Sequence, residues 1–334
     1  MDEQASGAVM DLTQADWERL AEMRAGFLRA PDMEGAVVDY WHSRRDLLIY
    51  DATFGARIEW KWRAVLAEIA RRGIDVPTGS VLDWGAGTGV ATRAFLRAFG
   101  AADRRVHLFD RSQAALEFAA NAIAREIPGA KLGTDPCNAP DVLLVSHVLD
   151  ELDSDGVAAL LATARRARLV IWVESGAKAC ARKLSTLREH MLDELTPLLP
   201  CTHRAACGVL AEDRAGDWCH HFAPPAAEAF TTKHWRTFSH TLSIDLRSLP
   251  YAYLVARRTS ECTAPTNAAV RLIGTARVEK GRARLLVCDA SGVRESRLLE
   301  RTDKAYFKAL GKGTAERLLA LEEAEGRITR IVPL

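Results

Sequence analysis

The 334-residue chain has almost no net charge, few aromatic residues and no long apolar run. Its formal charge is +1, and aromatic residues make up 7% of the composition. No apolar stretch approaches the roughly 20 residues that a membrane-spanning helix needs, so we expect no membrane association. The first twenty residues are acidic and lack a basic segment followed by an apolar one. This pattern does not match a secretion or transit signal and predicts a cytoplasmic, bacterial protein.

Cysteine is also scarce, and its number argues against structural disulfides. Seven cysteines form an odd set in a chain of this length, which favours a reducing compartment over a disulfide framework. Hydrophobic residues make up 48% of the chain, which is sufficient for a packed core in one large domain or two smaller ones. We expect the protein to be a monomer.

The near-zero net charge conceals an uneven distribution. Residues 257–312 contain 13 lysines and arginines against 6 aspartates and glutamates. A basic block of this kind is typical of a surface that faces a polyanion such as RNA. The alternative is an ordinary solvated surface.

The pattern of apolar residues predicts three regions. Residues 1–75 are expected to be helical, because apolar side chains recur there at spacings of three and four. Residues 76–258 alternate short apolar strands with helices, which predicts an α/β domain with a doubly wound, mainly parallel sheet. Residues 259–334 are expected to form a basic, β-rich extension that ends in a charged helix over 302–326.

Two details of the α/β region depend on weaker patterns. A cysteine-rich insertion is expected at 197–224, opening with a turn flanked by Pro197 and Pro200. After it, the runs at 237–246 and 251–258 are expected to be strands that complete the sheet at one edge.

The segment "VLDWGAGTGVAT", residues 81–92, is the strongest single motif. An apolar strand ends at Asp83, and a glycine-rich turn leads into a helix. Glycines are needed where the backbone turns tightly and approaches a ligand. This order resembles the first motif of class I S-adenosylmethionine-dependent methyltransferases, whereas a phosphate-binding loop would contain Gly-Lys-Ser/Thr. A dinucleotide-binding fold is the closest alternative.

A second acidic residue supports the methyltransferase interpretation. Asp110 ends the next predicted strand, 27 residues after Asp83, where it is placed to accept hydrogen bonds from ribose hydroxyls. The residues expected to hold S-adenosylmethionine are Asp83, Gly85, Ala86, Gly87, Gly89, Asp110 and Ser146.

No residue is identified as a catalyst. Enzymes that methylate exocyclic base nitrogens resemble one another in an Asn/Asp-Pro-Pro-aromatic motif after the fourth strand, where this chain has "SHVLDEL". Cys137 precedes that strand and is interpreted as an ordinary loop thiol. His147 is either a base near the methyl group or a hydrogen-bonded structural histidine.

The window "CTHRAACGVLAEDRAGDWCHHF", residues 201–222, contains three cysteines and three histidines. Five residues separate Cys201 from Cys207, eleven separate Cys207 from Cys219, and 68 separate Cys219 from Cys288. Structural zinc sites usually contain closely spaced cysteine pairs, and an iron–sulfur cluster tolerates more varied spacing. The spacing alone therefore leaves an iron–sulfur cluster, zinc and unrelated thiols open.

Several segments together resemble the methyltransferase-like proteins of mitochondrial small-ribosomal-subunit assembly and their bacterial relatives. They are "VLDWGAGTG", "SHVLDEL", "VESG", "DWCHHF", "GTARVEKGRARLLVCDASG" and "KAYFKALGK", which fall between about residues 35 and 312. The combination of "WCHHF" with a distant cysteine in a basic strand is more specific than the glycine motif, which many methyltransferases share.

This resemblance implies a four-iron, four-sulfur (4Fe-4S) cluster, with zinc as the alternative metal, and association with small-subunit rRNA. The residues that match the family's cluster ligands are Cys201, Cys207, Cys219 and Cys288. Relatives often have Cys-Pro-His and Cys-Pro at the first two ligands, whereas this chain has "CTH" and "CG". The conformation of this loop is therefore expected to differ.

Three functions remain open at this point. The first is an S-adenosylmethionine-dependent rRNA methyltransferase, which the intact glycine turn and Asp110 favour. The second is a catalytically inactive factor of small-subunit assembly, which the missing acceptor motif favours. The third is a methyltransferase that acts on a small molecule.

Overall fold

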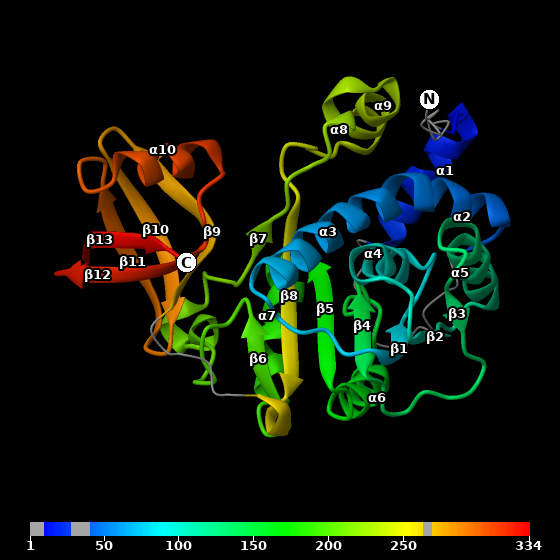
Figure 1. The fold of residues 1–334 in the computed structure, drawn as a ribbon. Helices are drawn as coiled ribbons and strands as arrows, with labels where there is room; N and C mark the ends of the chain where they lie inside the picture. Colours follow the sequence, from blue (N-terminus) through cyan, green and yellow to red (C-terminus); the bar gives the residue numbers. More distant parts are fainter. Residues whose placement is uncertain (1–9, 28–40, 263–268) are drawn as a thin grey trace, which may run out of the picture. The chain divides into compact units, whose positions relative to one another are not determined.

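The computed structural model describes residues 10–27, 41–262 and 269–334 (Figure 1). The chain divides into two compact units, each assembled from separate segments. Unit 1 comprises residues 1–74, 83–134 and 223–249, and unit 2 comprises residues 75–82, 135–222 and 250–334. In the described ranges, no helix combines the length and the apolar character that crossing a membrane would require.

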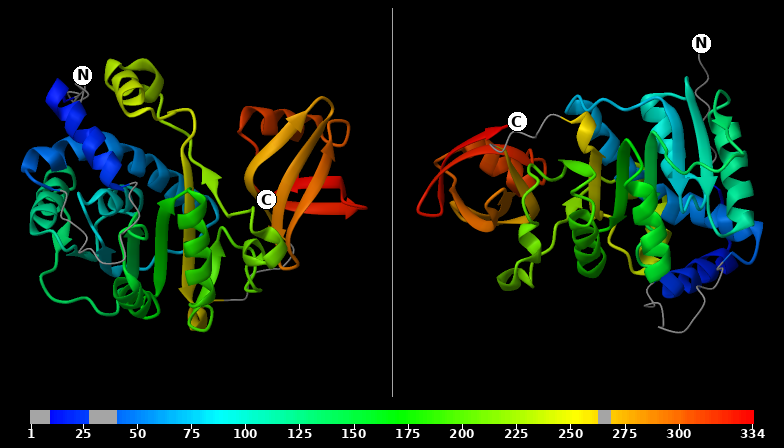
Figure 2. Two further views of the ribbon diagram at one scale, coloured as in Figure 1. Left: turned by 180° about the vertical axis from the view of Figure 1, so that it is seen from behind. Right: turned by 90° about the horizontal axis from the view of Figure 1, so that it is seen from below.

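An eight-stranded sheet is the main element of the α/β fold (Figures 1 and 2). Its strand order is β3-β2-β1-β4-β5-β8-β6, and β7 pairs with β8. Strand β8 is antiparallel to β5 and to β6, whereas β4 and β5 are parallel, as are β2 and β3. The strands are β1 (Gly79–Trp84), β2 (Arg104–Phe109), β3 (Lys131–Leu132), β4 (Val142–Ser146), β5 (Leu169–Ser175), β6 (Leu195–Leu199), β7 (His221–Phe222) and β8 (Pro250–Arg258). This order, with one antiparallel strand beside the edge strand, is that of class I S-adenosylmethionine-dependent methyltransferases, and it confirms the predicted fold class.

Unit 1 contains the helices of the N-terminal region and those that follow β1 and β2. Trp62, Val65 and Ile69 of α3 are fully buried, as their helical spacing predicts. Arg93 of α4 forms ion pairs with Asp51 and Glu126 and so joins three of these helices. The helices are α1 (Gln14–Phe27), α2 (Arg44–Tyr50), a π-helix η1 (Asp51–Gly55), α3 (Ala56–Arg71), α4 (Val90–Phe99), α5 (Gln113–Glu126), α8 (Glu228–Thr231) and α9 (Lys233–Leu242).

The strand expected at 237–246 is wrong, because most of this segment belongs to α9. The hydroxyl of Thr232 accepts a hydrogen bond from the backbone N–H of Trp235 and caps the helix. Trp235, Phe238 and Leu242 are buried, and their spacing of three and four places them on one helical face. The β-branched and hydroxyl residues of this run suggested a strand, but the cap and the apolar spacing determine its structure.

Unit 2 contains the rest of the sheet, two helices that follow β4 and β5, and the cysteine window. The helices are α6 (Ser154–Ala164), α7 (Lys178–Glu189) and the short 3-10 helices η2 (Gly208–Leu210), η3 (Glu212–Arg214) and η4 (Thr259–Glu261). The turn expected at Pro197 is also wrong, because Pro197 lies within β6. Proline is tolerated there because β6 is the last strand of the sheet and pairs only with β8.

The C-terminal part of unit 2 is a closed five-stranded barrel in the order β10-β11-β13-β12-β9 (Figure 1). Its elements are β9 (Val270–Glu279), β10 (Arg282–Asp289), β11 (Gly292–Leu299), α10 (Lys304–Lys312), β12 (Leu318–Ala324) and β13 (Arg327–Pro333). Strands β11 and β13 are parallel, whereas the other pairs are antiparallel. This connectivity, with a helix between the third and fourth strands, is that of an OB-fold.

The prediction of a helix over 302–326 is correct only for its first part. Helix α10 ends at Lys312, and Gly313 follows with a φ of 70°, a conformation that terminates many helices. Residues 318–324 form β12 although they are good helix formers. Leu319 of this strand is fully buried in the barrel core, so closure of the barrel overrides local helix propensity.

The cysteine window contacts both the sheet and the barrel of unit 2. Arg182 of α7 donates hydrogen bonds to the backbone carbonyls of Val209 and Asp217 in the window. On the barrel side, the backbone N–H of Gly274 donates to the carbonyl of His220. The window therefore joins the methyltransferase sheet to the barrel.

Gly208 makes the closest of these approaches. A Cβ atom at this position would lie 2.5 Å from the amide nitrogen of Val293 and 2.8 Å from the carbonyl carbon of Gly292. Both atoms belong to the backbone, so a change of side-chain rotamer cannot relieve the clash.

We therefore predict that Gly208→Ala separates the window from the β10–β11 hairpin. The expected cost is roughly 1–3 kcal/mol of unfolding free energy, as for other overpacked sites, with faster proteolysis of the barrel. Gly216→Ala is the matched control, because a Cβ at Gly216 meets nothing within 4 Å. Equal stability of the two variants in urea titrations would contradict the prediction.

Candidate functional site

The glycine-rich turn connects β1 to α4 in unit 1, as the sequence predicts. Gly87 and Gly89 have φ values of 52° and 77°, which residues with a Cβ rarely adopt. At Gly89, a Cβ would also lie 3.0 Å from the Cβ of Ala119. The backbone amides of Gly85 and Ala86 donate to the carbonyl of Phe109 at 2.7 and 3.0 Å, which holds the turn against the end of β2.

Asp83 lies beneath this turn and is fully buried. Its Oδ2 accepts hydrogen bonds from the hydroxyl of Thr92 at 2.7 Å and from the Thr92 amide at 3.2 Å. Its Oδ1 has no hydrogen-bond partner among the described residues. Burial raises the pKa of Asp83 to about 6. The carboxyl group therefore retains one buried acceptor that a bound ligand can use.

Asp110 follows β2 and lies beside the turn. Its Oδ2 accepts from the amide of Gly87 at 2.8 Å, and its Oδ1 accepts from the amide of Ser112 at 2.9 Å. Phe109 precedes it, is 50% exposed and packs against Trp84 with ring centroids 5.2 Å apart. Phe109 and Trp84 were not among the predicted site residues, although each is a large aromatic residue beside a predicted acidic one.

Ser146 is the last residue of β4, in unit 2, and the segment after it has an unusual backbone. His147 adopts a φ of 55°, and the Ser146 hydroxyl lies 3.4 Å from its Nδ1. The amides of Val148 and Leu149 donate to Oε1 of Glu174 at 3.1 and 3.3 Å.

Glu174 organises this segment from a buried position in β5. It is 1% exposed, and its Oε1 also accepts from Nε1 of Trp172 at 2.8 Å. Burial raises the pKa of Glu174 to about 7. Glu174 belongs to the "VESG" segment but was not predicted as a site residue; a carboxyl group after an apolar run was the available signal.

The four predicted metal-ligand cysteines line one cavity of about 20 Å³ in unit 2, together with Arg188 and Arg271. The Sγ atoms of Cys219 and Cys288 lie 3.7 Å from Nε2 of His221 and His203, respectively. Burial raises the pKa of Cys288 to about 12 and raises that of Cys219 well above its usual range, with further contributions from the neighbouring thiols. Within the described ranges, no three histidine, cysteine, aspartate or glutamate side chains are arranged as ligands of one metal ion. The metal site therefore stays a prediction.

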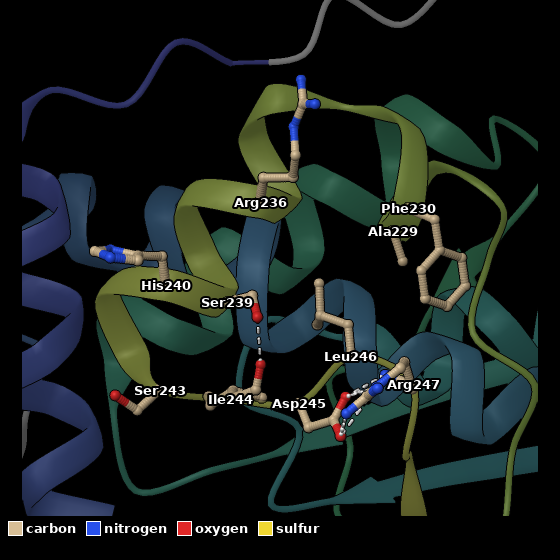
Figure 3. Close-up of a pocket in the computed structure, with 10 residues that line it drawn as sticks. All are labelled: Ala229, Phe230, Arg236, Ser239, His240, Ser243, Ile244, Asp245, Leu246 and Arg247. Carbon is tan, nitrogen blue, oxygen red and sulfur yellow. Dashed lines mark hydrogen bonds and ion pairs between the residues drawn. The ribbon is translucent and has the colours of Figure 1, made fainter.

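A larger and more open cavity, of about 610 Å³, lies in the α8–α9 segment of unit 1 (Figure 3). None of the predicted site residues lines it. Asp245 and Arg247 form an ion pair with each other, and the Ser239 hydroxyl donates to the carbonyl of Ile244. Arg236 points away from Leu246 in Figure 3. Most polar groups of this cavity are thus paired locally or directed elsewhere.

The burial of Glu174 generates a test in pH. The unfolded carboxyl ionises near its ordinary value of 4.5, whereas the folded one ionises near 7. The unfolding free energy of the wild type should therefore fall as the pH rises from about 4.5 to about 7. The expected fall is about 3 kcal/mol, because each pKa unit corresponds to about 1.36 kcal/mol. Glu174→Gln should lack the part of the fall between about pH 6 and 7, whereas the part that comes from Asp83, whose pKa burial raises from 3.8 to about 6, should remain.

The measurement is a series of urea unfolding curves between pH 4 and 8. Glu212→Gln changes an exposed glutamate of η3 and should retain the wild-type profile. If Glu174→Gln showed the same pH dependence as the wild type, another group would be responsible.

Comparison with known proteins gives one match to a family model and many to solved structures. One of these structures is magnesium protoporphyrin IX methyltransferase from Synechocystis PCC 6803 with bound SAM. Its sequence is 11% identical, the match covers 75% of this chain and all of that chain, and the TM-score is 0.39. A putative RNA methyltransferase from Pyrococcus horikoshii matches at 11% identity over 73% of this chain and 98% of that one, with a TM-score of 0.36. No curated protein matches the chain.

The family model that matches is described as mitochondrial small ribosomal subunit Rsm22, and it covers residues 47–313. This range includes the glycine-rich turn, the cysteine window and the barrel strand that carries Cys288. The match extends over most of the chain and agrees with the resemblance inferred from the sequence. The chain belongs to the Rsm22 family of methyltransferase-like proteins.

Proposed function

We propose that this protein binds S-adenosylmethionine, carries a 4Fe-4S cluster and acts on the RNA of the small ribosomal subunit. Membership of the Rsm22 family is the main support for this proposal, because the family description names the mitochondrial small ribosomal subunit. The residues of the two predicted sites, for the cofactor and for the metal, support it separately.

The residues around the glycine-rich turn fit S-adenosylmethionine. The free Oδ1 of buried Asp83 suits the ammonium group of the methionine part. The backbone at Gly87 leaves space for a ligand, since a Cβ there would meet nothing within 4 Å. Asp110 is half-buried and suits the ribose hydroxyls, with Phe109 beside it as an apolar surface for the adenine. When bound, the cofactor supplies an activated methyl group.

The four cysteines that line one cavity supply the number of thiolate ligands that a four-cysteine metal centre needs. Such a centre, with either a 4Fe-4S core or zinc, carries a net charge of about −2. Arg188 and Arg271 are each 3% exposed and line the same cavity. Arg188 also pairs with Glu189, and the two guanidinium groups place positive charge beside a buried anion. The thiols must lose their protons to bind metal, and binding would join Cys288 of the barrel to three cysteines of the window.

Methyl transfer and non-catalytic assembly are the two activities that this site allows. The vacant acceptor on Asp83 favours retained cofactor binding and hence a methyltransferase. The structural role of Glu174 favours an assembly factor, because the segment after β4 is held by a buried carboxylate and contains no recognised acceptor motif. Incubation of small subunits with radiolabelled cofactor distinguishes them by the presence or absence of label in RNA.

For the cofactor site, we predict that Asp110→Asn weakens S-adenosylmethionine binding by roughly ten- to a hundredfold. A carboxylate accepts hydrogen bonds from two hydroxyls more strongly than an amide, by about 1.5–3 kcal/mol. Asp103→Asn is the control, since Asp103 lies at the opposite end of the same strand, is exposed and has a φ of 57° that asparagine tolerates. Isothermal titration calorimetry would contradict the prediction if both variants bound the cofactor equally.

For the metal site, we predict that anaerobic purification yields brown protein with about four irons per chain. Cys288→Ser should lose most of this iron and make β9–β13 more sensitive to protease. The reason is that the barrel would no longer supply a ligand to the metal that joins it to the window. Cys137→Ser, which changes a loop thiol outside the cavity, should retain both properties. Colourless protein that contains one zinc ion per chain would show that the metal is zinc and not an iron–sulfur cluster. Unchanged iron content in Cys288→Ser would exclude this ligand set.

A further inference from the structure

Four arginines occupy directly opposed positions on four strands of the C-terminal barrel. Arg277 of β9 is opposite Arg284 of β10, Arg284 is opposite Arg297 of β11, and Arg297 is the parallel partner of Arg327 in β13. Directly paired residues of neighbouring strands point to the same face of a sheet. We call these four residues the arginine row.

The row lies on the outer face of the barrel. The residues that follow its members along the strands, Leu285, Leu298 and Ile328, are fully buried in the barrel core. Because side chains alternate along a strand, Arg284, Arg297 and Arg327 point outward. Arg277, Arg297 and Arg327 are exposed, and with strands about 4.8 Å apart the row extends over about 14 Å.

Like charges in opposed positions destabilise a sheet unless they are compensated. Arginines outside the row are compensated by carboxylates of the same barrel: Arg294 pairs with Asp289 and Glu323, and Arg330 pairs with Glu322. In the row, Arg284 pairs with Glu279, which also pairs with Arg282. No ion pair of Arg277, Arg297 or Arg327 is found among the described residues. The row is thus a line of positive charge with one shared carboxylate.

The position of the row matches the surface that OB-folds use for ligands. That surface is the face of the second and third strands, bordered by the loops between strands one and two and between strands four and five. Here these strands are β10 and β11, and the two loops are the turns at Lys280–Gly281 and Glu325–Gly326. The amide of Arg297 donates to the carbonyl of Gly326 at 3.0 Å, which places the second turn beside the row.

We propose that the arginine row is a binding site for the sugar-phosphate backbone of single-stranded RNA. Guanidinium groups match phosphate oxygens in geometry as well as charge. The described barrel contains two aromatic residues, Tyr306 and Phe307, and both are buried in its core, so the site lacks the aromatic surface on which bases stack. Binding is therefore independent of base sequence and dominated by counterion release. This inference rests on the proposed function for its partner and adds the site and the mode of contact.

The test uses the full-length protein and a triple variant, Arg277→Gln, Arg297→Gln and Arg327→Gln. The control is Arg301→Gln, Lys304→Gln and Lys308→Gln, which removes the same charge from exposed residues of the same barrel. Binding to a fluorescent single-stranded RNA of mixed sequence and to an RNA duplex is measured by anisotropy between about 50 and 200 mM salt.

We expect the triple variant to bind the single strand roughly tenfold or more weakly at ~0.1 M salt. The slope of log affinity against log salt should become shallower by about 2, at about 0.7 per phosphate contact. The control should keep the wild-type slope. Three results would each overturn the proposal. The first is an equal slope for the two variants, and the second is a preference of the wild type for the duplex. The third is a triple variant that loses binding to anionic vesicles but retains binding to RNA.

Two further measurements separate this proposal from the proposed function. The triple variant should retain cofactor binding and iron content, because none of the changed residues lines the cysteine cavity or belongs to the glycine-rich turn. If the wild type sediments with small subunits and the triple variant binds single-stranded RNA as tightly as the control, the arginine row is excluded while the ribosomal function stands. If the wild type binds neither RNA nor small subunits, both proposals fail.

Discussion

The close approach of the cysteine window to the β10–β11 hairpin is the contact on which the organisation of unit 2 depends. Gly208 places the window against the backbone of Gly292 and Val293, while Arg182 holds the same window to α7. The window thereby attaches the OB-fold to the methyltransferase sheet. The cysteines lie within this junction, so any metal bound there would act on the attachment as well as on local stability.

Local patterns in the sequence predict the elements whose structure depends on neighbouring residues. The turn from β1 into α4 follows from glycines that adopt positive φ values, and β4 and β5 follow from uninterrupted apolar runs. Residues 237–246 and 318–324 were assigned wrongly because propensity competes there with other constraints. A side-chain cap and a buried aromatic face determine the first segment, and closure of the barrel determines the second. The barrel order itself depends on pairings between distant strands, which no local pattern contains.

The candidate sites show the same division between local and distant information. Asp83 and Asp110 are identified from their positions at strand ends, whereas the role of Glu174 depends on amides of the segment that follows β4. The four cysteines were grouped by family resemblance, since their spacing left several alternatives open. Their meeting at one cavity is a property of the fold. Three of the four opposed arginines lie in the basic block at 257–312, whereas Arg327 lies outside it, and only strand register shows that the four form a line.

The division of the chain into interleaved units has a consequence for its synthesis. Unit 1 requires residues 223–249, and unit 2 requires residues on both sides of that segment. Neither unit can be completed while the ribosome is still translating the middle of the gene, and domains that fold during synthesis do so from the N-terminus. Three cysteines of the window emerge long before Cys288 and β10. A nascent chain would therefore expose an incomplete set of thiols until β10 is made, so completion of this site would report that the window and β10 have been synthesised and brought together.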